Sequence, residues 1–303
     1  MNSFVLEVHG LCKKYGHQLV LNHFDMRVQQ GSIYGFVGEN GAGKTTLIRL
    51  IAGLDFPTCG KLSLFDESDP RILRRQRSRM GFLIEGPALY LDMTARQNLE
   101  MICIQRGIPD KQEIDHILEL MSLKENSNKK VHNFSLGMRQ RLGIAIALLG
   151  EPEFLILDEP INGLDPTGIL EIRDILIGLN KRKGTTILIS SHILPELENM
   201  ATHYGFIHKG RMLQEITAES LAKKCRQFVL LKTDNKEKAA AILEDELHSH
   251  EFDVYPDGSI HIFDLINRSE EVAACLTTHQ IAVKEITICG ERLENYFKNL
   301  IGV

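Results

Sequence analysis

A short glycine-rich stretch carries a lysine and a threonine at the spacing of a phosphate-binding loop. Residues 38–45 read GENGAGKT and match G-x-x-x-x-G-K-[ST], after an apolar run at 33–37 and before a helical pattern at 45–54. In this arrangement backbone N–H groups at the helix start face a phosphate, and the lysine supplies a cation. A plain glycine-rich turn would not need all these features in register, so the stretch predicts a nucleoside-triphosphate site. The residues expected to contact the nucleotide are Gly38, Asn40, Gly41, Gly43, Lys44, Thr45 and Thr46.

Two carboxylates at the end of another apolar run supply the second part of a hydrolytic site. Residues 154–160 read FLILDEP, so Asp158 and Glu159 stand at the end of a predicted strand. Asp158 is expected to hold Mg²⁺ through water, together with the hydroxyl of Thr45. Glu159 faces another direction and is the predicted general base for the attacking water. Two acids at a strand end are common without such a role, and the upstream phosphate loop is what favours the catalytic interpretation.

These motifs require a sheet that brings strand ends together. The two apolar runs above, and a third at 186–190, are nearly continuous and are flanked by helical segments. Such runs indicate a parallel sheet covered on both faces, in which ligands bind beyond the carboxyl ends of the strands. Between about 88 and 150 the pattern becomes helical, and Thr94-x-x-Gln97 is a candidate capping box. The predicted fold is therefore α/β, a mainly parallel sheet with a helical insertion.

A second domain is expected after the sheet domain. From about residue 220 the predicted order is strand, helix, hairpin, helix, strand, which is the βαββαβ pattern of ferredoxin-like folds. Pro256-Asp257-Gly258 marks the hairpin turn, and a last helix reads ERLENYFKNL. We therefore predict an ATP-binding domain over residues 1–219, with a helical subdomain at about 88–150, and an accessory α+β domain over residues 220–303.

Composition and charge limit the classes of function. The chain has 303 residues, of which 43% are hydrophobic and 25% charged, and its net charge is −5. An acidic balance argues against a dominant nucleic-acid surface. The six cysteines form neither a C-x-x-C pair nor a framework spacing and indicate reduced thiols. The N-terminus lacks a secretory signal and no stretch approaches the roughly 18 apolar residues of a membrane span, so we expect a peripheral subunit in any membrane role.

The order of motifs along residues 1–215 resembles that of the ATP-binding subunits of ABC transporters. Besides the phosphate loop (Walker A) and the acidic strand end (Walker B), Tyr15 in KKYG resembles the aromatic residue that stacks on adenine. Residues 134–141, FSLGMRQR, resemble the signature motif, and residues 162–166, NGLDP, resemble the D-loop. His192 in SSHIL resembles the switch histidine. Walker motifs are shared by many families, whereas this ordered set is specific.

The signature motif has a physical interpretation as a second anion site. Ser135 is predicted to cap the helix that follows, and the free N–H groups of that helix start attract anions. Gly137 would allow close backbone approach. Leu136 and Met138 replace the glycine and glutamine of the common wording LSGGQ, but the serine and the second glycine are kept. A serine of this kind is usually a plain helix cap. Here the resemblance implies two copies meeting head to tail, each signature helix closing over the γ-phosphate of the other copy.

The resemblance also implies roles for two further side chains. His192 would hydrogen-bond the γ-phosphate and orient Glu159. Asp165 would shape the dimer contact between the two sites. The other histidines, including His248 and His250, have no metal-ligand company in the sequence and are interpreted as solvated.

Glu85 is a departure from the family pattern. It ends an apolar run and precedes Gly86-Pro87, which forbid a simple continuation of strand or helix. ABC subunits normally place a glutamine here, and a glutamate loses the amide donor and adds a full charge. We expect Glu85 to help hold Mg²⁺ and to couple its state to a permease, with Gly86-Pro87 as the hinge region; the alternative is a tolerated acid without a role. A glutamate here, with FSLGMRQR and a closing LENYFKNL, resembles the branch devoted to bacitracin resistance and lantibiotic self-protection.

The expected function is ATP hydrolysis by a subunit that powers a membrane exporter of a peptide antibiotic. Its partners would be integral membrane permease chains and a second copy of itself, at the cytoplasmic side of a bacterial membrane, with no nucleic acid. The main alternative is a soluble ABC-type ATPase acting on ribosomes or DNA, although such proteins resemble two fused cassettes and favour a basic face. An importer subunit is a third alternative, which the lack of a sugar- or metal-sensing pattern in residues 220–303 disfavours. For that domain, bracing of the dimer is favoured over regulation or partner binding.

Overall fold

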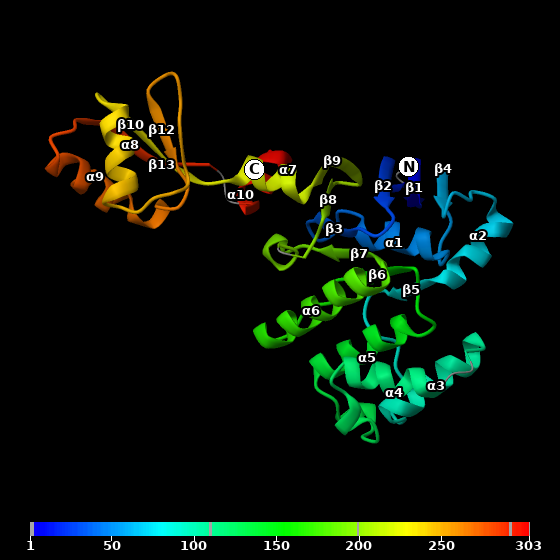
Figure 1. Ribbon diagram of the computed structural model, residues 1–303. Helices are drawn as coiled ribbons and strands as arrows, with labels where there is room; N and C mark the ends of the chain where they lie inside the picture. Colours follow the sequence, from blue (N-terminus) through cyan, green and yellow to red (C-terminus); the bar gives the residue numbers. More distant parts are fainter. Residues whose placement is uncertain (1–2, 109–110, 199, 291–292, 303) are drawn as a thin grey trace. The chain divides into compact units, whose positions relative to one another are not determined.

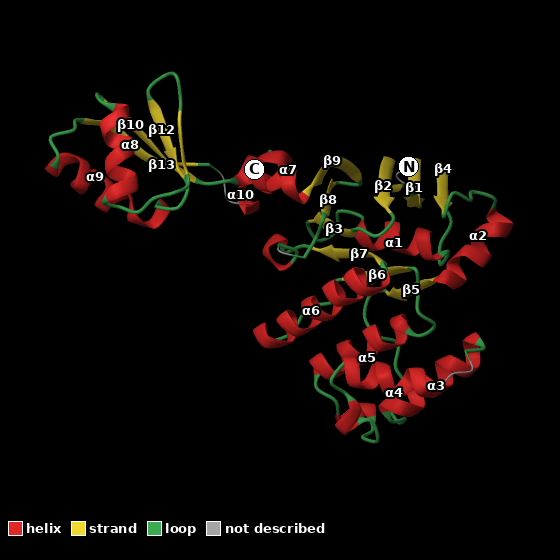
Figure 2. Ribbon diagram, viewed as in Figure 1, coloured by secondary structure: helices red, strands yellow, loops and turns green. Residues whose placement is uncertain are grey.

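The computed structural model describes residues 3–108, 111–198, 200–290 and 293–302 (Figure 1). Contacts within the chain divide it into two compact units, residues 1–218 and 219–303. Helices and strands alternate along most of the first unit (Figure 2). Its strands are β1 (Phe4–Tyr15), β2 (Gln18–Gln29), β3 (Ile33–Gly38), β4 (Cys59–Leu64), β5 (Met80–Leu83), β6 (Phe154–Asp158), β7 (Thr186–Ser191), β8 (His203–His208) and β9 (Arg211–Thr217). Its helices are α1 (Lys44–Ala52), α2 (Pro70–Gln76), α3 (Ala95–Arg106), α4 (Lys111–Leu120), α5 (Leu136–Leu148) and α6 (Pro166–Lys183).

A six-stranded sheet forms the centre of the first unit. Its order is β5-β6-β7-β3-β8-β9, in which the first five strands are parallel and β9 pairs antiparallel with β8. Every residue of β3, β6 and β7 is buried, which explains why their sequences read as continuous apolar runs. The predicted parallel sheet is confirmed. Because β6, β7 and β3 are neighbours, the motif residues at their carboxyl ends meet at one edge of the sheet.

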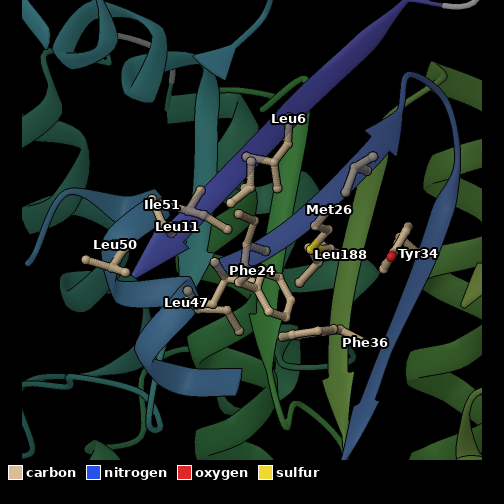
Figure 3. Close-up of a cluster of buried hydrophobic side chains, with 14 of the residues drawn as sticks. Leu6, Leu11, Phe24, Met26, Tyr34, Phe36, Leu47, Leu50, Ile51 and Leu188 are labelled. Atoms are coloured by element: carbon tan, nitrogen blue, oxygen red, sulfur yellow. The ribbon is translucent and has the colours of Figure 1, made fainter. Parts of the chain in front are cut away.

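A three-stranded antiparallel sheet, β2-β1-β4, shares a hydrophobic core with β3 and α1 (Figure 3). The rings of Phe24 on β2 and Phe36 on β3 meet edge to face, with their centroids 5.9 Å apart. Leu6 on β1 and Leu47 and Ile51 on α1 are fully buried beside them. The phosphate loop joins β3 to α1, so this core fixes both ends of the loop.

Helices α3, α4 and α5 fill the segment between β5 and β6 (Figure 1). The predicted capping box begins α3: Gln97 N donates to Thr94 Oγ1 over 3.2 Å, and Thr94 N donates to Gln97 Oε1 over 2.9 Å. Helix α5 packs directly on β5, because a Cβ atom on Gly81 of β5 would lie only 2.0 Å from the carbonyl oxygen of Ala147. None of the described helices is long and apolar enough to cross a membrane.

The second unit is built on a four-stranded antiparallel sheet of order β11-β12-β10-β13. Two helices of the β-α-β-β-α-β run, α8 and α9, cover its core, and the predicted element order is confirmed. The hairpin turns at Gly258, which has a φ of 88°, and Tyr255 N donates to Ser259 O over 2.9 Å. The elements of this part of the chain are α7 (Ala218–Cys225), β10 (Phe228–Thr233), α8 (Lys236–Asp245), β11 (Phe252–Val254), β12 (Ser259–Ile262), α9 (Ser269–Thr278), β13 (Val283–Cys289) and α10 (Leu293–Ile301).

Candidate active site

The phosphate loop leaves β3 at Gly38 and enters α1 at Lys44. Gly41 and Gly43 have φ angles of 80° and 111°, a region that disfavours residues with a Cβ atom. At Gly38 the restriction is steric, because a Cβ atom would lie 2.6 Å from the carbonyl oxygen of Ile207 on β8. The glycines of the motif are therefore needed to form a loop whose N–H groups precede a helix start.

Lys44 lies inside the loop and is only 5% exposed. Its Nζ donates to Gly38 O over 2.6 Å and to Glu39 O over 3.3 Å, and it lies 3.3 Å from Glu159 Oε1. The loop thus holds a buried cation in contact with a carboxylate. An arriving phosphate would find this cation already positioned.

Asp158 ends β6 and is almost fully buried. Thr45 Oγ1 donates to its Oδ2 over 2.8 Å, and Ser190 Oγ donates to its Oδ1 over 2.5 Å. The hydroxyl of Thr45 and the carboxylate of Asp158 are hard oxygen donors, the type that Mg²⁺ prefers. The residues present therefore fit a magnesium site beside the phosphate loop.

Glu159 follows β6 directly and has a φ of 50°, so its side chain leaves the strand in a different direction from that of Asp158. Its backbone N–H is held by Ser190, over 3.0 Å to Oγ and 3.2 Å to O. Nδ1 of His192 lies 2.5 Å from Glu159 Oε2, while the other carboxylate oxygen faces Lys44. The expected pairing of Glu159 with His192 is present in the geometry, and the carboxylate is fixed at both oxygens.

Tyr15 ends β1 and is 44% exposed, which leaves part of its ring available to a ligand. Its hydroxyl donates to Asp55 Oδ2, and Lys13 Nζ lies 2.5 Å from Asp55 Oδ1 and 4.7 Å from the Tyr15 ring centroid. The hydrogen bonds from Lys13 and then Tyr15 lower the pKa of Asp55 to about 2, and the bond to Asp55 raises the pKa of Tyr15. Asp55 therefore holds the ring edge as an ionised acceptor.

Glu85 lies after β5 in a loop with unusual backbone angles, with a φ of 57° at Glu85 and 112° at Gly86. Arg49 Nη1 donates to Glu85 Oε1 over 3.0 Å. Arg49 stands one helical turn beyond Thr45 on α1, so Glu85 is held against the same helix that supplies the proposed magnesium ligand. Both side chains are about half exposed, and such a pair contributes only about 0–1 kcal/mol to stability. Little free energy would be needed to redirect this carboxylate.

The signature motif begins α5, and the predicted helix cap is present: Met138 N donates to Ser135 Oγ over 3.3 Å. The motif packs on the D-loop of its own chain. A Cβ atom on Gly137 would lie 3.3 Å from Leu164 Cδ2, and one on Gly163 would lie 2.6 Å from Leu136 Cδ2. Asp165 occupies the N-cap position of α6. The two motifs assigned to a dimer contact are therefore neighbours in the fold.

The structure joins Lys44, Thr45, Asp158, Glu159 and His192 into one connected cluster. Tyr15 lies near it through its interaction with Thr46, and Glu85 through its ion pair with Arg49 on α1. Ser135, Gly137 and Asp165 belong to the neighbouring signature and D-loop surface.

Several residues of the site were not predicted. The sequence marks Ser190 only as the end of the apolar run 186–190, although its hydroxyl bonds both Asp158 and the backbone N–H of Glu159. Lys13 and Asp55 fix Tyr15, and Arg49 fixes Glu85. For Ser190, the available signal was its position two residues before His192 at the end of an apolar run.

Known proteins are similar to this chain along almost its whole length. Residues 21–162 match the family model described as ABC transporter. Over 300 residues the chain is 41% identical to the bacitracin transport ATP-binding protein BcrA of Bacillus licheniformis, covering 99% of this chain and 98% of that protein. It is also 40% identical over 211 residues to the lantibiotic transport ATP-binding protein SrtF of Streptococcus pyogenes, covering 70% of this chain and 90% of that protein.

Solved structures show the same fold. An ATP-binding subunit of an ABC transporter, 30% identical, superposes with a TM-score of 0.65 over 72% of this chain and 92% of that chain. A dimeric bacterial ABC transporter cassette, 24% identical, has a TM-score of 0.64 over 70% of this chain and 98% of that chain. At that identity the second likeness shows the fold alone.

Proposed function

The chain belongs to the ATP-binding proteins of ABC transporters, and on this premise we propose that its ATPase powers the export of a peptide antibiotic of the bacitracin or lantibiotic type. The observation that carries the proposal is the extent of the similarity. The match to a bacitracin transport ATP-binding protein covers 99% of the chain, so it includes the second unit as well as the ATPase core.

The site residues account for how ATP would be held. The phosphates would occupy the loop at 38–45 and take Lys44 Nζ as their cation. Thr45 and Asp158 would hold Mg²⁺, which neutralises charge on the phosphates, and we include Glu85 as a further oxygen donor to that ion. Tyr15 would stack on the adenine with its edge fixed by Asp55.

Hydrolysis would rest on Glu159 and His192. The proposed base, Glu159, has one oxygen against Lys44 and the other against His192 Nδ1. When phosphates attract Lys44, Glu159 Oε1 becomes free to accept a proton from the attacking water. His192 retains the second oxygen and keeps the carboxylate oriented, as an orienting group does in other acid–base pairs.

A complete transporter would also contain a second copy of this chain and a permease. We propose that Ser135 and Gly137 of one copy close over the γ-phosphate of the other, with Asp165 at the contact, and that membrane permease chains bind the cassette at the cytoplasmic face of a bacterial membrane. Two observations support this proposal. Ser135 caps α5 at the surface, where the N–H groups of the helix start attract anions. Leu136, the next residue, is 60% exposed. Action on ribosomes or DNA is less consistent with the net charge of −5.

The decisive experiment uses the variant Glu159→Gln, which should bind ATP but hydrolyse it very slowly. The tagged variant would be expressed in its native host, solubilised in mild detergent with Mg-ATP, and its copurifying proteins identified. A polytopic membrane protein, together with loss of peptide-antibiotic resistance in the host, is the expected result. Ribosomes or nucleic acid without a membrane partner would support the alternative function instead.

A further inference from the structure

Three side chains of the second unit bring a carboxylate, a thiol and an imidazole together. The ligand atoms of Glu246, Cys275 and His279 all lie within 4.8 Å of one another. Glu246 Oε1 is 2.7 Å from His279 Nε2, and Cys275 Sγ donates to Glu246 Oε2 over 3.4 Å. The expectation that the remaining histidines have no metal-ligand company is therefore wrong for His279. It failed because Glu246 is 29 residues from Cys275 in sequence.

The fold fixes the positions of these three residues. Cys275 and His279 are four residues apart at the end of α9, so they point to the same side of that helix. Buried Val272 and Leu276 anchor α9 to the core. Glu246 follows α8, and its backbone N–H donates to Ile242 O over 3.0 Å. The cluster thus joins the end of α8 to α9, and Cys275 itself packs against the core of the unit.

We propose that Glu246, Cys275 and His279 form a binding site for a divalent transition-metal ion of the Zn²⁺ class. Thiolate, imidazole and carboxylate are the ligands that Zn²⁺ takes, and three protein ligands leave a fourth position for water. With Zn–ligand bonds of about 2.0–2.3 Å, tetrahedral donor atoms lie roughly 3.3–3.8 Å apart. The 3.4 Å contact between Cys275 and Glu246 already fits, and rotation of the exposed Glu246 carboxylate would widen its 2.7 Å contact with His279.

Charges around the cluster favour a cation. The carboxylates of Glu246 and Glu271 both lie close enough to Cys275 to act on it electrostatically, and Glu246 accepts its thiol hydrogen bond. Arg268 is paired with Glu271, and Lys238 Nζ donates to the backbone oxygen of His279 over 3.3 Å rather than to one of the three ligand side chains. On binding, the Cys275 thiol would lose its proton to solvent as the metal–sulfur bond forms, and neutral His279 would supply its Nε2 lone pair.

The competing interpretation is an ion pair between Glu246 and His279 that joins α8 to α9. An ion pair does not involve the Cys275 thiol, so an experiment that detects metal bound to this thiol distinguishes the two interpretations. The full chain, freed of metal with a chelator and kept without nucleotide, would be titrated with Co²⁺ and then with Zn²⁺. We expect one equivalent of Co²⁺ to give a thiolate-to-cobalt absorption band that Zn²⁺ abolishes.

Variants make the assignment specific. Cys275→Ser should remove the band, and His279→Gln should weaken Co²⁺ binding by about tenfold or more. Cys289→Ser is the matched control, because this cysteine lies in the same unit outside the cluster and should leave the band unchanged. Circular dichroism would establish that each variant is folded. Absence of the band in the unaltered chain, or its persistence in Cys275→Ser, would overturn the proposal, and neither result bears on the ATPase.

Discussion

At the scale of single residues, Ser190 links the two acidic residues of the active site, Asp158 and Glu159. Its Oγ donates to Asp158 over 2.5 Å and accepts from the backbone N–H of Glu159 over 3.0 Å. The serine is fully buried on β7, so water cannot replace it. Its single hydroxyl therefore fixes the carboxylate of Asp158, the proposed magnesium ligand. The same hydroxyl holds the strained backbone of Glu159, the proposed base.

Replacing Ser190 with alanine should reduce ATPase activity without unfolding the protein. A lost hydrogen bond to a buried charged group costs about 1.5–3 kcal/mol, so we expect kcat to fall by about 10- to 100-fold. Steady-state ATPase assays with Mg-ATP would measure this. Ser191→Ala is the matched control, because Ser191 bonds Glu196 and the backbone of Ile193 instead and should have a smaller effect. Equal losses in both variants would count against the linking role of Ser190.

Asp55 makes an acid-dependent contribution to stability. Its pKa is lowered to about 2 in the folded chain, from an ordinary value of 3.8, by hydrogen bonds from Lys13 and Tyr15. A carboxyl group whose pKa is lower in the folded than in the unfolded chain stabilises the fold at pH values above its unfolded pKa. This stabilisation is lost as the pH falls through its folded pKa. The wild-type chain should therefore unfold at a higher temperature than Asp55→Asn above about pH 4, with a difference that shrinks toward pH 2. Thermal unfolding across this range measures it, and a constant difference would contradict the assignment.

Residues within short motifs could be predicted, and residues that support them from a distance could not. Lys44, Thr45, Asp158 and Glu159 are specified by local patterns that fix their chemistry. Arg49 pairs with Glu85 across 36 residues, as Lys13 pairs with Asp55 across 42. Such partners depend on how elements pack, which no local pattern encodes.

At the scale of elements, β5, the loop after it and α5 form one mechanical connection. Gly81 and Gly143 allow β5 and its loop to approach α5 closely, since a Cβ atom on Gly143 would lie 2.6 Å from the Cβ of Pro87. The start of α5 is the signature motif with Ser135 as its cap. A movement of the loop that carries Glu85 would therefore press on the signature helix. This packing gives the proposed coupling by Glu85 a physical route.

Two substitutions should affect the Mg²⁺ requirement of the ATPase differently. Glu85→Gln removes the proposed carboxylate ligand and should raise the Mg²⁺ concentration for half-maximal ATPase several-fold, with reduced antibiotic resistance. Arg49→Gln releases Glu85 from its ion pair and should leave that concentration unchanged or lower it. Titrations of ATPase rate against Mg²⁺ at fixed ATP would measure both. If Glu85→Gln altered neither the ATPase rate nor resistance, the role of Glu85 would be rejected.

Elements with uniform burial were predictable, and irregular ones were not. Strands β3, β6 and β7 are buried throughout, and the capping box correctly predicts the start of α3. The antiparallel sheet β2-β1-β4 was not predicted. Its β1–β2 pairing contains four register shifts, for example between Val8 and Leu11, and these disrupt the alternation that would mark a strand.

At the scale of the whole molecule, one chain carries both the Walker residues and the signature motif, which we propose to contribute to the ATP sites of two different copies. The Walker residues gather at one edge of the six-stranded sheet, and the signature motif caps α5 beside the D-loop. The proposed anion site at Ser135 has no evident use within one copy. In the proposed dimer, it would bind the γ-phosphate of the ATP that is held by the other copy.

The charge at position 135 tests this arrangement. Aspartate and asparagine both cap helices about as well as serine, so Ser135→Asp and Ser135→Asn should both keep α5 intact. Combined with Glu159→Gln, which prevents turnover, Ser135→Asn should still form an ATP-dependent dimer, whereas Ser135→Asp would repel the γ-phosphate and remain monomeric. Light scattering after size-exclusion chromatography with Mg-ATP measures the mass. Dimers of equal stability in both variants would mean that Ser135 does not face the partner's phosphate, because a full negative charge there would then carry no cost.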